Sequence, residues 1–289
     1  MFDASATPAE EKNNNKKSPW SDLTVRVMSG VVLAVLAFAV TWWGGIAFAL
    51  FFGVVAILVF WEWVRIVGER ALGTPAIIGY GCLLGSMISL WFGAWQAGLV
   101  LPVLGAAFLS LVRCSYPAAR WTALGILYAS SFGFAILALR LDSDFGFAAI
   151  LVLFALVWGT DVAAYFTGKI VKGPKLWTRV SPKKTWSGSI GGLVLGTGFA
   201  LLVAFLLKIE PTLKLVVMLG GLSVLSQLGD LAESQIKRIF KVKDSSSLIP
   251  GHGGVMDRVD GLLFAVVAAC MIGLASGSIH SVATGFLIW

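Results

Sequence analysis

Long apolar runs separated by short polar segments dominate the hydrophobic pattern of this chain. Most runs approach the roughly 20 residues that an α-helix needs to cross a bilayer. Helices are expected because backbone polar groups in lipid must find their hydrogen bonds within their own segment. The pattern predicts about nine membrane-spanning helices, at residues 27–44, 46–64, 76–95, 97–113, 121–139, 147–166, 189–207, 213–231 and 260–276.

The composition favours the same all-α, polytopic membrane architecture. Hydrophobic residues make up 58% of the 289 residues and charged residues only 13%, about half the charged fraction of an average soluble domain. Cys82, Cys114 and Cys270 lie in or beside separate runs without paired spacing. We interpret them as small buried hydrophobic residues rather than as disulfide partners or zinc ligands.

The positive charges indicate how the chain is oriented in the membrane. All but three of the 22 Lys and Arg residues fall on one side of the predicted membrane, and the exceptions are Arg140, Lys208 and Lys214. Lys and Arg are enriched in cytoplasmic loops, so we expect a cytoplasmic N-terminus. The net charge of +7 then indicates a surface that faces anionic membrane lipids, with no nucleic-acid partner.

The chain divides into three predicted regions. Residues 1–23 are polar and therefore read as a disordered cytoplasmic arm. They are not expected to be a signal peptide, because no apolar core and cleavage site follow the charges. Residues 24–140 hold N-terminal membrane helices with little chemistry in their loops, and residues 141–289 form a C-terminal catalytic domain. In the N-terminal half, we interpret Glu62 as an interface residue that snorkels or pairs with Arg65, in preference to a functional role.

Acidic residues at membrane depth distinguish the C-terminal half. A charge there costs at least ~2.5 kcal/mol on insertion scales, so such residues are functional by default. Asp161 in the sixth span is predicted to contact a cation or a substrate. Asp230 and Asp257 end and begin consecutive spans on the same side of the membrane. They could face one another across one Mg²⁺, which prefers one or two carboxylates completed by substrate phosphates.

The loop after the sixth span is basic and rich in glycine. Ser181 and the following proline are expected to start a turn, with Lys183, Lys184 and Thr185 just ahead of the next helix. Lysines, hydroxyls and free backbone N–H groups at a helix N-terminus form an anion site. We therefore predict that Lys183 or Lys184 contacts phosphate, although positive-inside topology alone would also place lysines here.

The end of the eighth span carries a polar stripe. If the helix continues past Asp230, then Asp230, Ser234, Lys237 and Lys241 share one face, while apolar residues lie apart from it as in an interfacial helix. Glu233 and Lys237 form a favourable i,i+4 pair.

A glycine-rich loop follows this stripe. The glycines let the backbone approach a ligand closely, so His252 is predicted to contact phosphate or base. Asp257 and Asp260 share a helix face beside Arg258. An Asp near a helix N-terminus is also explained by the helix dipole, and for Asp260 both interpretations stay open.

Together these motifs resemble the signature of the phosphatidate cytidylyltransferases, the CDP-diacylglycerol synthases. The matching positions are Ser234, Lys237, Arg238, Lys243, Asp244, Pro250, His252, Gly253, Gly254, Asp257, Arg258 and Asp260. The match extends upstream through Asp161–Lys169 and Ser181–Thr185 and covers roughly residues 155–265, whereas the N-terminal half resembles the family only in hydropathy. The family commonly has a Glu two residues after the Thr of SPKKT, where this chain has Ser187.

The resemblance implies Mg²⁺-dependent transfer of CMP from CTP to phosphatidic acid in the bacterial inner membrane, for phospholipid biosynthesis. Asp230 and Asp257 would be metal ligands, and the active site would be cytoplasmic. The other catalytic candidates are Lys237, Arg238, His252 and Arg258. The substrate-binding candidates are Asp161, Ser181, Lys183, Lys184, Thr185, Ser234, Lys243, Asp244, Gly253, Gly254 and Asp260. A homodimer and a second, monovalent cation are further candidates.

Two other classes of function stay open. A secondary transporter could use Asp161 and Asp230 as cation sites, but it predicts inverted repeats with matching helix breaks, and the chain has no visible internal repeat. A related membrane enzyme that uses CTP or a lipid phosphate, such as a polyprenol or phytol kinase or an archaeal-type CDP-lipid synthase, is the closer alternative.

Overall fold

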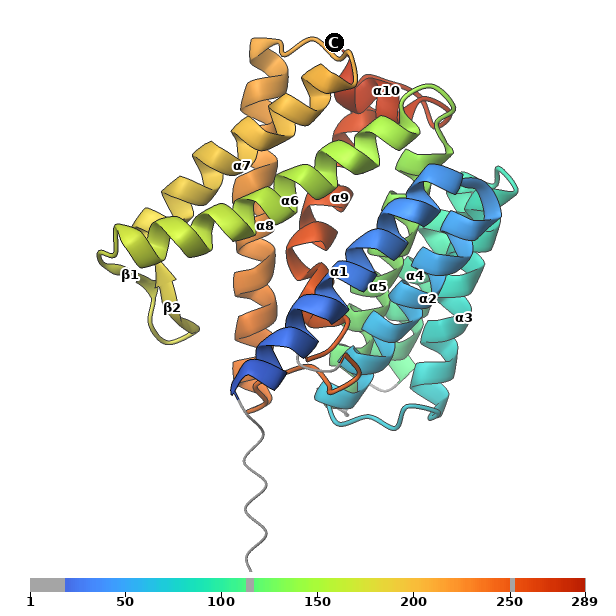
Figure 1. The fold of residues 1–289 in the computed structure, drawn as a ribbon. Coiled ribbons are helices and arrows are strands. Elements are labelled where there is room, and N and C mark those ends of the chain that lie inside the picture. Colours follow the sequence, from blue (N-terminus) through green and yellow to red (C-terminus); the bar gives the residue numbers. More distant parts are fainter. Residues whose placement is uncertain (1–18, 113–116, 250–252, 289) are drawn as a thin grey trace, which may run out of the picture.

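The computed structural model describes residues 19–112, 117–249 and 253–288, and side chains from Val27 onward. Within these residues the chain is almost entirely helical (Figure 1). The helices are α1 (Pro19–Trp43), α2 (Gly45–Ile66), α3 (Thr74–Trp91), α4 (Trp95–Val112), α5 (Pro117–Leu141), α6 (Gly146–Ile170), α7 (Trp186–Leu206), α8 (Leu213–Ile239), α9 (Met256–Ser276) and the short α10 (Val282–Leu287). The strands are β1 (Lys175–Trp177) and β2 (Ser181–Thr185).

The prediction of a polytopic helical membrane protein is confirmed. In the described part of the chain, eight helices, α2 to α9, are long and apolar enough to cross a membrane. The ninth predicted span corresponds to α1, whose described apolar stretch is the shorter Val27–Trp43. α1 begins at Pro19, inside the segment expected to be a disordered arm.

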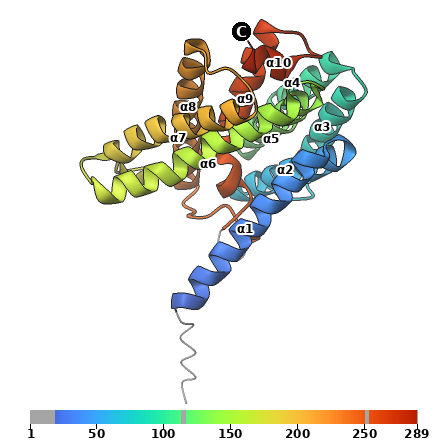
Figure 2. The ribbon, with the colours of Figure 1, turned by 45° about the horizontal axis from the view of Figure 1, so that its top comes forward.

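Helices α2 to α5 form one bundle, and α6 and α7 form a long pair that leans away from it (Figures 1 and 2). The α6–α7 pair packs tightly because α7 presents glycines to α6. A Cβ atom at Gly196 would lie 2.7 Å from Thr160 N, and one at Gly192 would lie 2.9 Å from Thr160 O. Small residues that let helix backbones approach closely are a common way to join helices in lipid.

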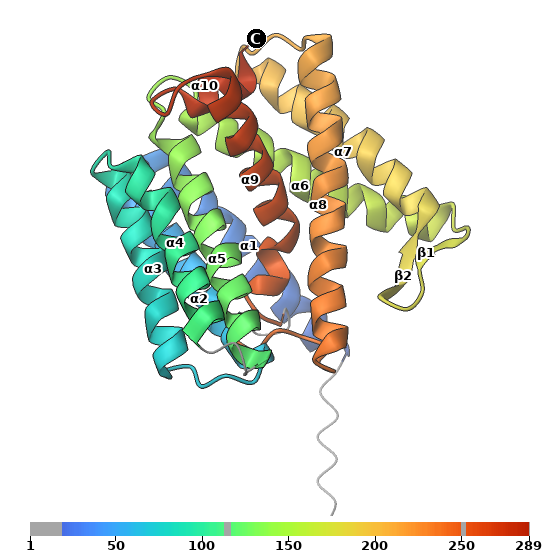
Figure 3. The same ribbon diagram turned by 180° about the vertical axis from the view of Figure 1, so that it is seen from behind.

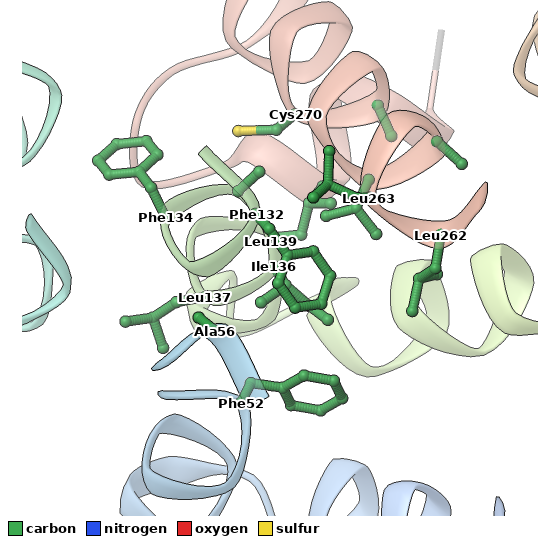
Figure 4. Packing of buried hydrophobic residues seen from close by; sticks show 14 of the residues in the cluster. Phe52, Ala56, Phe132, Phe134, Ile136, Leu137, Leu139, Leu262, Leu263 and Cys270 are labelled. Carbon is green, nitrogen blue, oxygen red and sulfur yellow. The ribbon is translucent and has the colours of Figure 1, made fainter. Parts of the chain in front are cut away.

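Helix α9 lies between α8 and the α2–α5 bundle (Figure 3). Its apolar face meets α5, the most completely buried of the spanning helices. The close view shows Leu263 and Cys270 of α9 beside Phe132 and Ile136 of α5, with Phe52 of α2 below them (Figure 4). This core joins the two halves of the chain.

The α2–α3 and α8–α9 connections and the start of α1 lie at one end of the molecule, and the α6–α7 connection projects to the side within the same half (Figures 1 and 3). We call this half the site end. Most of the basic residues singled out in the sequence lie on these connections, at 65–74, 169–184 and 237–258.

Several expected boundaries are wrong. α8 continues as one helix to Ile239, so Asp230 lies inside a span and not at its end. Lys241 lies beyond α8 in the left-handed region, with φ 57°, and does not extend the polar stripe. The residues Ser181–Thr185 form strand β2 of a small antiparallel hairpin, where a turn was expected. Lys183 and Lys184 therefore lie on a strand whose backbone is hydrogen-bonded to β1, and not in an irregular loop.

Candidate active site

A cavity of about 380 Å³ opens at the site end between α6, the β1–β2 hairpin, α7 and α8. Its charged lining combines two carboxylates with four ammonium groups. These residues are Asp161, Asp230, Lys169, Lys175, Lys183 and Lys184. Such a lining suits an anionic ligand that arrives with a cation, because the lysines attract phosphate oxygens and the carboxylates attract a metal ion.

An ion pair spans this cavity from β2 to α8. Lys184 Nζ lies 2.7 Å from Asp230 Oδ2, with the side chains 27% and 34% exposed. Ser234, one turn further along α8, donates from Oγ to Asp230 Oδ1 at 3.4 Å. The structure therefore brings together three of the predicted site residues. It also places a cationic group directly against the Asp230 carboxylate.

The N-terminus of α7 forms another wall of the cavity. Thr185 is its N-cap, and Thr185 Oγ1 accepts from Gly188 N at 3.1 Å. Ser187 Oγ contacts Thr185 Oγ1 at 3.2 Å and donates to the carbonyl oxygen of Lys172. Ser187 therefore joins α7 to the turn that follows α6. Because the Gly188 N–H group already donates to Thr185, it is less accessible to a phosphate than the ammonium groups of the lysine side chains.

Gln227 is a cavity residue that the sequence reasoning missed. It lies one turn before Asp230 on α8, lines the cavity, and exchanges hydrogen bonds with Ser189 of α7. The polar pair connects α7 and α8 beneath the ion pair. A polar side chain inside an apolar span was the signal that could have identified it.

A second cluster surrounds Lys237, one helical turn beyond Ser234. Lys237 Nζ lies 2.6 Å from Glu233 Oε2 and 2.7 Å from Asp257 Oδ1. The predicted Glu233–Lys237 pair is thus present. Asp257 Oδ2 also accepts from the backbone N–H groups of Ser245, at 3.0 Å, and Gly254, at 2.9 Å. We call Glu233, Lys237 and Asp257 the Lys237 cluster.

Asp260 lies between the Lys237 cluster and the cavity carboxylates Asp230 and Asp161. Asp260 is within electrostatic range of both carboxylates and of Lys184, and Asp161 is within range of Lys184 and Arg258. The backbones of α8 and α9 meet here, since a Cβ atom at Gly229 would lie 2.6 Å from the carbonyl oxygen of Asp260. Asp260 is also within range of Glu233, so it lies between the Lys237 cluster and the group of Asp161, Asp230 and Lys184, which we call the Asp230 cluster.

The two clusters divide the predicted metal ligands. Asp230 lines the cavity, whereas the oxygens of Asp257 are held by Lys237 and by backbone donors. In the described part of the chain, no group of three His, Cys, Asp or Glu side chains is arranged to hold a metal ion. A cation at Asp230 would therefore need oxygens from a ligand to complete its coordination.

The remaining predicted residues have varied positions. Arg238 is exposed and donates to the carbonyl oxygen of Val242 at 3.3 Å, closing the end of α8. Lys243 and Asp244 are exposed on the loop, and Ser181 is half-buried at the start of β2. His252 lies outside the described residues.

Glu62 corrects an interpretation made from the sequence. It is fully buried and does not snorkel. Its neighbour Arg65 lies instead over the ring of Trp61, 4.7 Å from its centroid. The Glu62 carboxylate accepts hydrogen bonds from both arms of the α8–α9 loop, so the N-terminal half contributes to the site end.

The fold and the site define a class: a polytopic membrane protein with a cavity lined by lysines and carboxylates at one end of its bundle. The chain belongs to the cytidylyltransferase family, whose family model matches residues 24–275. This match reaches well beyond residues 155–265 and includes the N-terminal helices.

Relatives from several bacteria share most of their length with the chain. The phosphatidate cytidylyltransferase of Brucella suis biovar 1 (strain 1330) is 40% identical over 256 residues, 88% of this chain and 94% of the relative. That of Pseudomonas aeruginosa is 35% identical over 248 residues, covering 81% and 90%. That of Bacillus subtilis (strain 168) is 28% identical over 254 residues, covering 84% and 94%.

Proposed function

We propose that this chain transfers CMP from CTP to phosphatidic acid, producing CDP-diacylglycerol and pyrophosphate for phospholipid synthesis. The observation that carries the proposal is 40% identity across 88% of the chain to an enzyme named for this reaction. The lysine-lined cavity supports it independently, because both substrates carry phosphate groups and one of them is a membrane lipid.

The chemistry needs positioning and charge neutralisation more than a protein nucleophile. An oxygen of the lipid phosphate attacks the α-phosphorus of CTP, and the bond from that phosphorus to the bridging oxygen of pyrophosphate breaks. A phosphate monoester is largely dianionic at neutral pH, since its second pKa is about 6, so no general base is required. Lys183 and Lys184 hold the phosphates in the cavity, and the charge that develops on the leaving group is stabilised by the same ammonium groups.

The carboxylates of the cavity fit a magnesium ion. Mg²⁺ takes hard oxygen ligands and is usually held by one or two carboxylates with substrate phosphates. Asp230 of α8 would be one of these carboxylates. Its contact with the Lys184 ammonium group indicates that the position beside this carboxylate suits a cation. When bound, the metal would polarise the phosphate oxygens and neutralise their charge.

The ligand contributed by α9 is Asp257 according to the sequence pattern, and Asp260 is the competing candidate. Asp260 is favoured because its backbone meets α8 at Gly229, next to Asp230, and Asp257 is opposed by its contacts with Lys237 and the loop. Mn²⁺ binding to Asp257→Asn and Asp260→Asn proteins, measured by electron paramagnetic resonance without nucleotide, distinguishes them. The variant that loses the greater share of Mn²⁺ affinity identifies the ligand.

We further propose that the site end faces the cytoplasm of a bacterial cell and that the chain lies in the inner membrane. The basic residues at this end support the orientation through the positive-inside rule. The test is a single cysteine introduced at the exposed Lys243 in a protein freed of its native cysteines. A membrane-impermeant maleimide should label it in inside-out vesicles and not in intact spheroplasts.

The activity is tested with purified protein, CTP, phosphatidic acid and Mg²⁺, following release of pyrophosphate. Wild type should release pyrophosphate only when both substrates are present. Asp257→Asn should lose at least about 100-fold in turnover, the scale for removing one electrostatic stabiliser. Asp144→Asn, on the turn before α6 at the opposite end, serves as the matched control.

Other outcomes would change the assignment. Release with a polyprenyl phosphate in place of phosphatidic acid would indicate a related lipid enzyme. Absence of release with any acceptor, together with Mg²⁺- or proton-coupled uptake into vesicles, would favour a transporter. Comparing K⁺ with Na⁺ in the same assay tests a second, monovalent cation. Crosslinking in native membranes tests a homodimer.

A further inference from the structure

Glu62 lies in α2, far from the C-terminal motifs in sequence, yet its carboxylate contacts both arms of the α8–α9 loop. Oε1 accepts from Ser246 Oγ at 2.6 Å and from Val255 N at 2.8 Å. Oε2 accepts from Ser245 Oγ at 2.8 Å and from Met256 N at 2.7 Å. Each oxygen therefore receives one hydroxyl from the first arm and one backbone N–H from the second.

This arrangement suits a carboxylate and no other side chain. Two of the four partners are backbone N–H groups, which can only donate, so Glu62 must accept from both. A fully buried charge without such partners would be very costly. Val255 and Met256 also begin α9, whose N-terminus carries unsatisfied N–H groups and a partial positive charge. Val255, at the N-cap position, makes no capping bond of its own, and Glu62 supplies the cap from another helix.

The contacts fix the geometry of the loop around Asp257. Ser245 approaches from one side and Gly254 from the other, and both donate a backbone N–H to the Asp257 carboxylate. Gly254 packs directly against Glu62, because a Cβ atom there would lie 2.5 Å from Glu62 Oε1 and 2.6 Å from Oε2. A bond from Ile249 N to the carbonyl oxygen of Gly253, at 2.9 Å, closes the loop above this point.

We propose that Glu62 is a positioning residue for the reaction: it clamps the two arms of the α8–α9 loop and so sets the place of the acidic first turn of α9. Through it the N-terminal helices act on the catalytic half of the chain. The proposal rests on the proposed function, because the loop and α9 carry the residues assigned to substrate and metal.

The test compares Glu62→Gln with wild type in two measurements. A glutamine keeps the size of the side chain, but its NH₂ group must face one backbone N–H group, donor against donor, whichever way the amide turns. We expect kcat/KM to fall about 10- to 100-fold, since small misplacements of reacting groups have effects of this size. Hydrogen exchange should rise about tenfold or more at the amides of Val255 and Met256, while the middle of α5 keeps its protection.

Two further variants make the test specific. Glu69→Gln changes an acid just beyond α2 that makes no described contact with the loop, and it should leave both measurements at wild-type values. Ser245→Ala removes a single hydroxyl donor and should reduce kcat/KM about threefold. In a Glu62→Gln background the same serine change should have a smaller effect, because its partner has already been altered. Ser245→Ala also keeps the proposal testable if Glu62→Gln fails to fold.

The outcomes separate positioning from general stability. Unchanged kcat/KM in Glu62→Gln would overturn the proposal. A second result would also overturn it: hydrogen exchange that rises equally in α2, α5 and the loop of Glu62→Gln while kcat per folded molecule stays constant. A residue with a purely structural role would give this result. A wild type that releases no pyrophosphate, together with the local rise in exchange, would refute the proposed activity and support the clamp.

Discussion

Replacing Lys184 with alanine should have opposite effects on two ligands of the same cavity. The ammonium group of Lys184 lies 2.7 Å from Asp230 Oδ2, so in the empty cavity it competes with a metal ion for this carboxylate. In the presence of CTP the same group is expected to move to phosphate oxygens. Lys184→Ala should therefore strengthen the binding of a divalent cation alone and weaken the binding of CTP.

The size of each effect follows from the exposure of the pair. The two side chains are 27% and 34% exposed, and ion pairs of this kind contribute about 0.2 to 1 kcal/mol. With about 1.36 kcal/mol for each factor of ten, metal affinity should rise about 1.4- to 5-fold. Hydrogen bonds to charged groups contribute about 1.5 to 3 kcal/mol, so CTP affinity should fall about 10- to 150-fold.

Both effects can be measured without turnover. Mn²⁺ binding is followed by electron paramagnetic resonance in the absence of nucleotide, and CTP binding by calorimetry without a lipid acceptor. Lys183→Ala is the matched control, because Lys183 lines the cavity and has no ion pair with Asp230. It should weaken CTP binding and change Mn²⁺ affinity less. Weaker Mn²⁺ binding in Lys184→Ala would refute the competition, since the lysine would then be supporting the metal site.

Two further variants test the packing around the site. Lys237→Met leaves the buried Glu233 and Asp257 without their shared cation. Because breaking a buried ion pair costs about 3 to 5 kcal/mol, both the thermal midpoint in detergent and pyrophosphate release should fall. A midpoint equal to that of wild type would contradict this. Gly196→Val places a Cβ atom 2.7 Å from Thr160 N and should lower the midpoint by separating α6 from α7, whereas Gly198→Val, with open space around it, should not.

The membrane helices and part of the cavity were predictable because both depend on local sequence. Apolar runs of spanning length must form helices in lipid, which located the nine long helices of the described chain, although the start of α1 and the end of α8 were each missed by eight residues. Asp161, Lys184 and Asp230 were each singled out as candidate site residues, and all three line one cavity. Charges inside apolar segments are expensive, so they draw attention to the site even when the tertiary structure is unknown.

Contacts between distant segments could not be predicted in the same way. An acid beside Arg65 at the end of a span favours a local ion pair, but Glu62 instead meets partners more than 180 residues away. Its single useful signal was a carboxylate inside a run of apolar and aromatic residues. Similarly, the division between Asp257 and Asp260 depends on which side of α9 faces α8, and their i,i+3 spacing alone places both on one face.

The tight α6–α7 pair carried a signal in the sequence that the motif analysis passed over. Gly188, Gly192 and Gly196 recur every four residues and so lie on one face of α7. Small residues at this spacing are typical of close helix contacts in membranes. In this chain they bring the lysines of β2 and the Asp161 carboxylate of α6 to the same cavity.

The site end depends on both halves of the chain, which argues against treating residues 24–140 as a separate scaffold. Besides Glu62, the indole N–H of Trp63 donates to the carbonyl oxygen of Trp121 at 2.7 Å, and the Trp121 ring meets Phe240 at the end of α8. The N-terminal helices therefore contact α8 where it ends and α9 where it begins. Since Asp230 and Lys237 lie on α8 and Asp257 on α9, any shift of the N-terminal bundle would alter the distance between the two clusters. The N-terminal half is thus expected to influence turnover without touching either substrate.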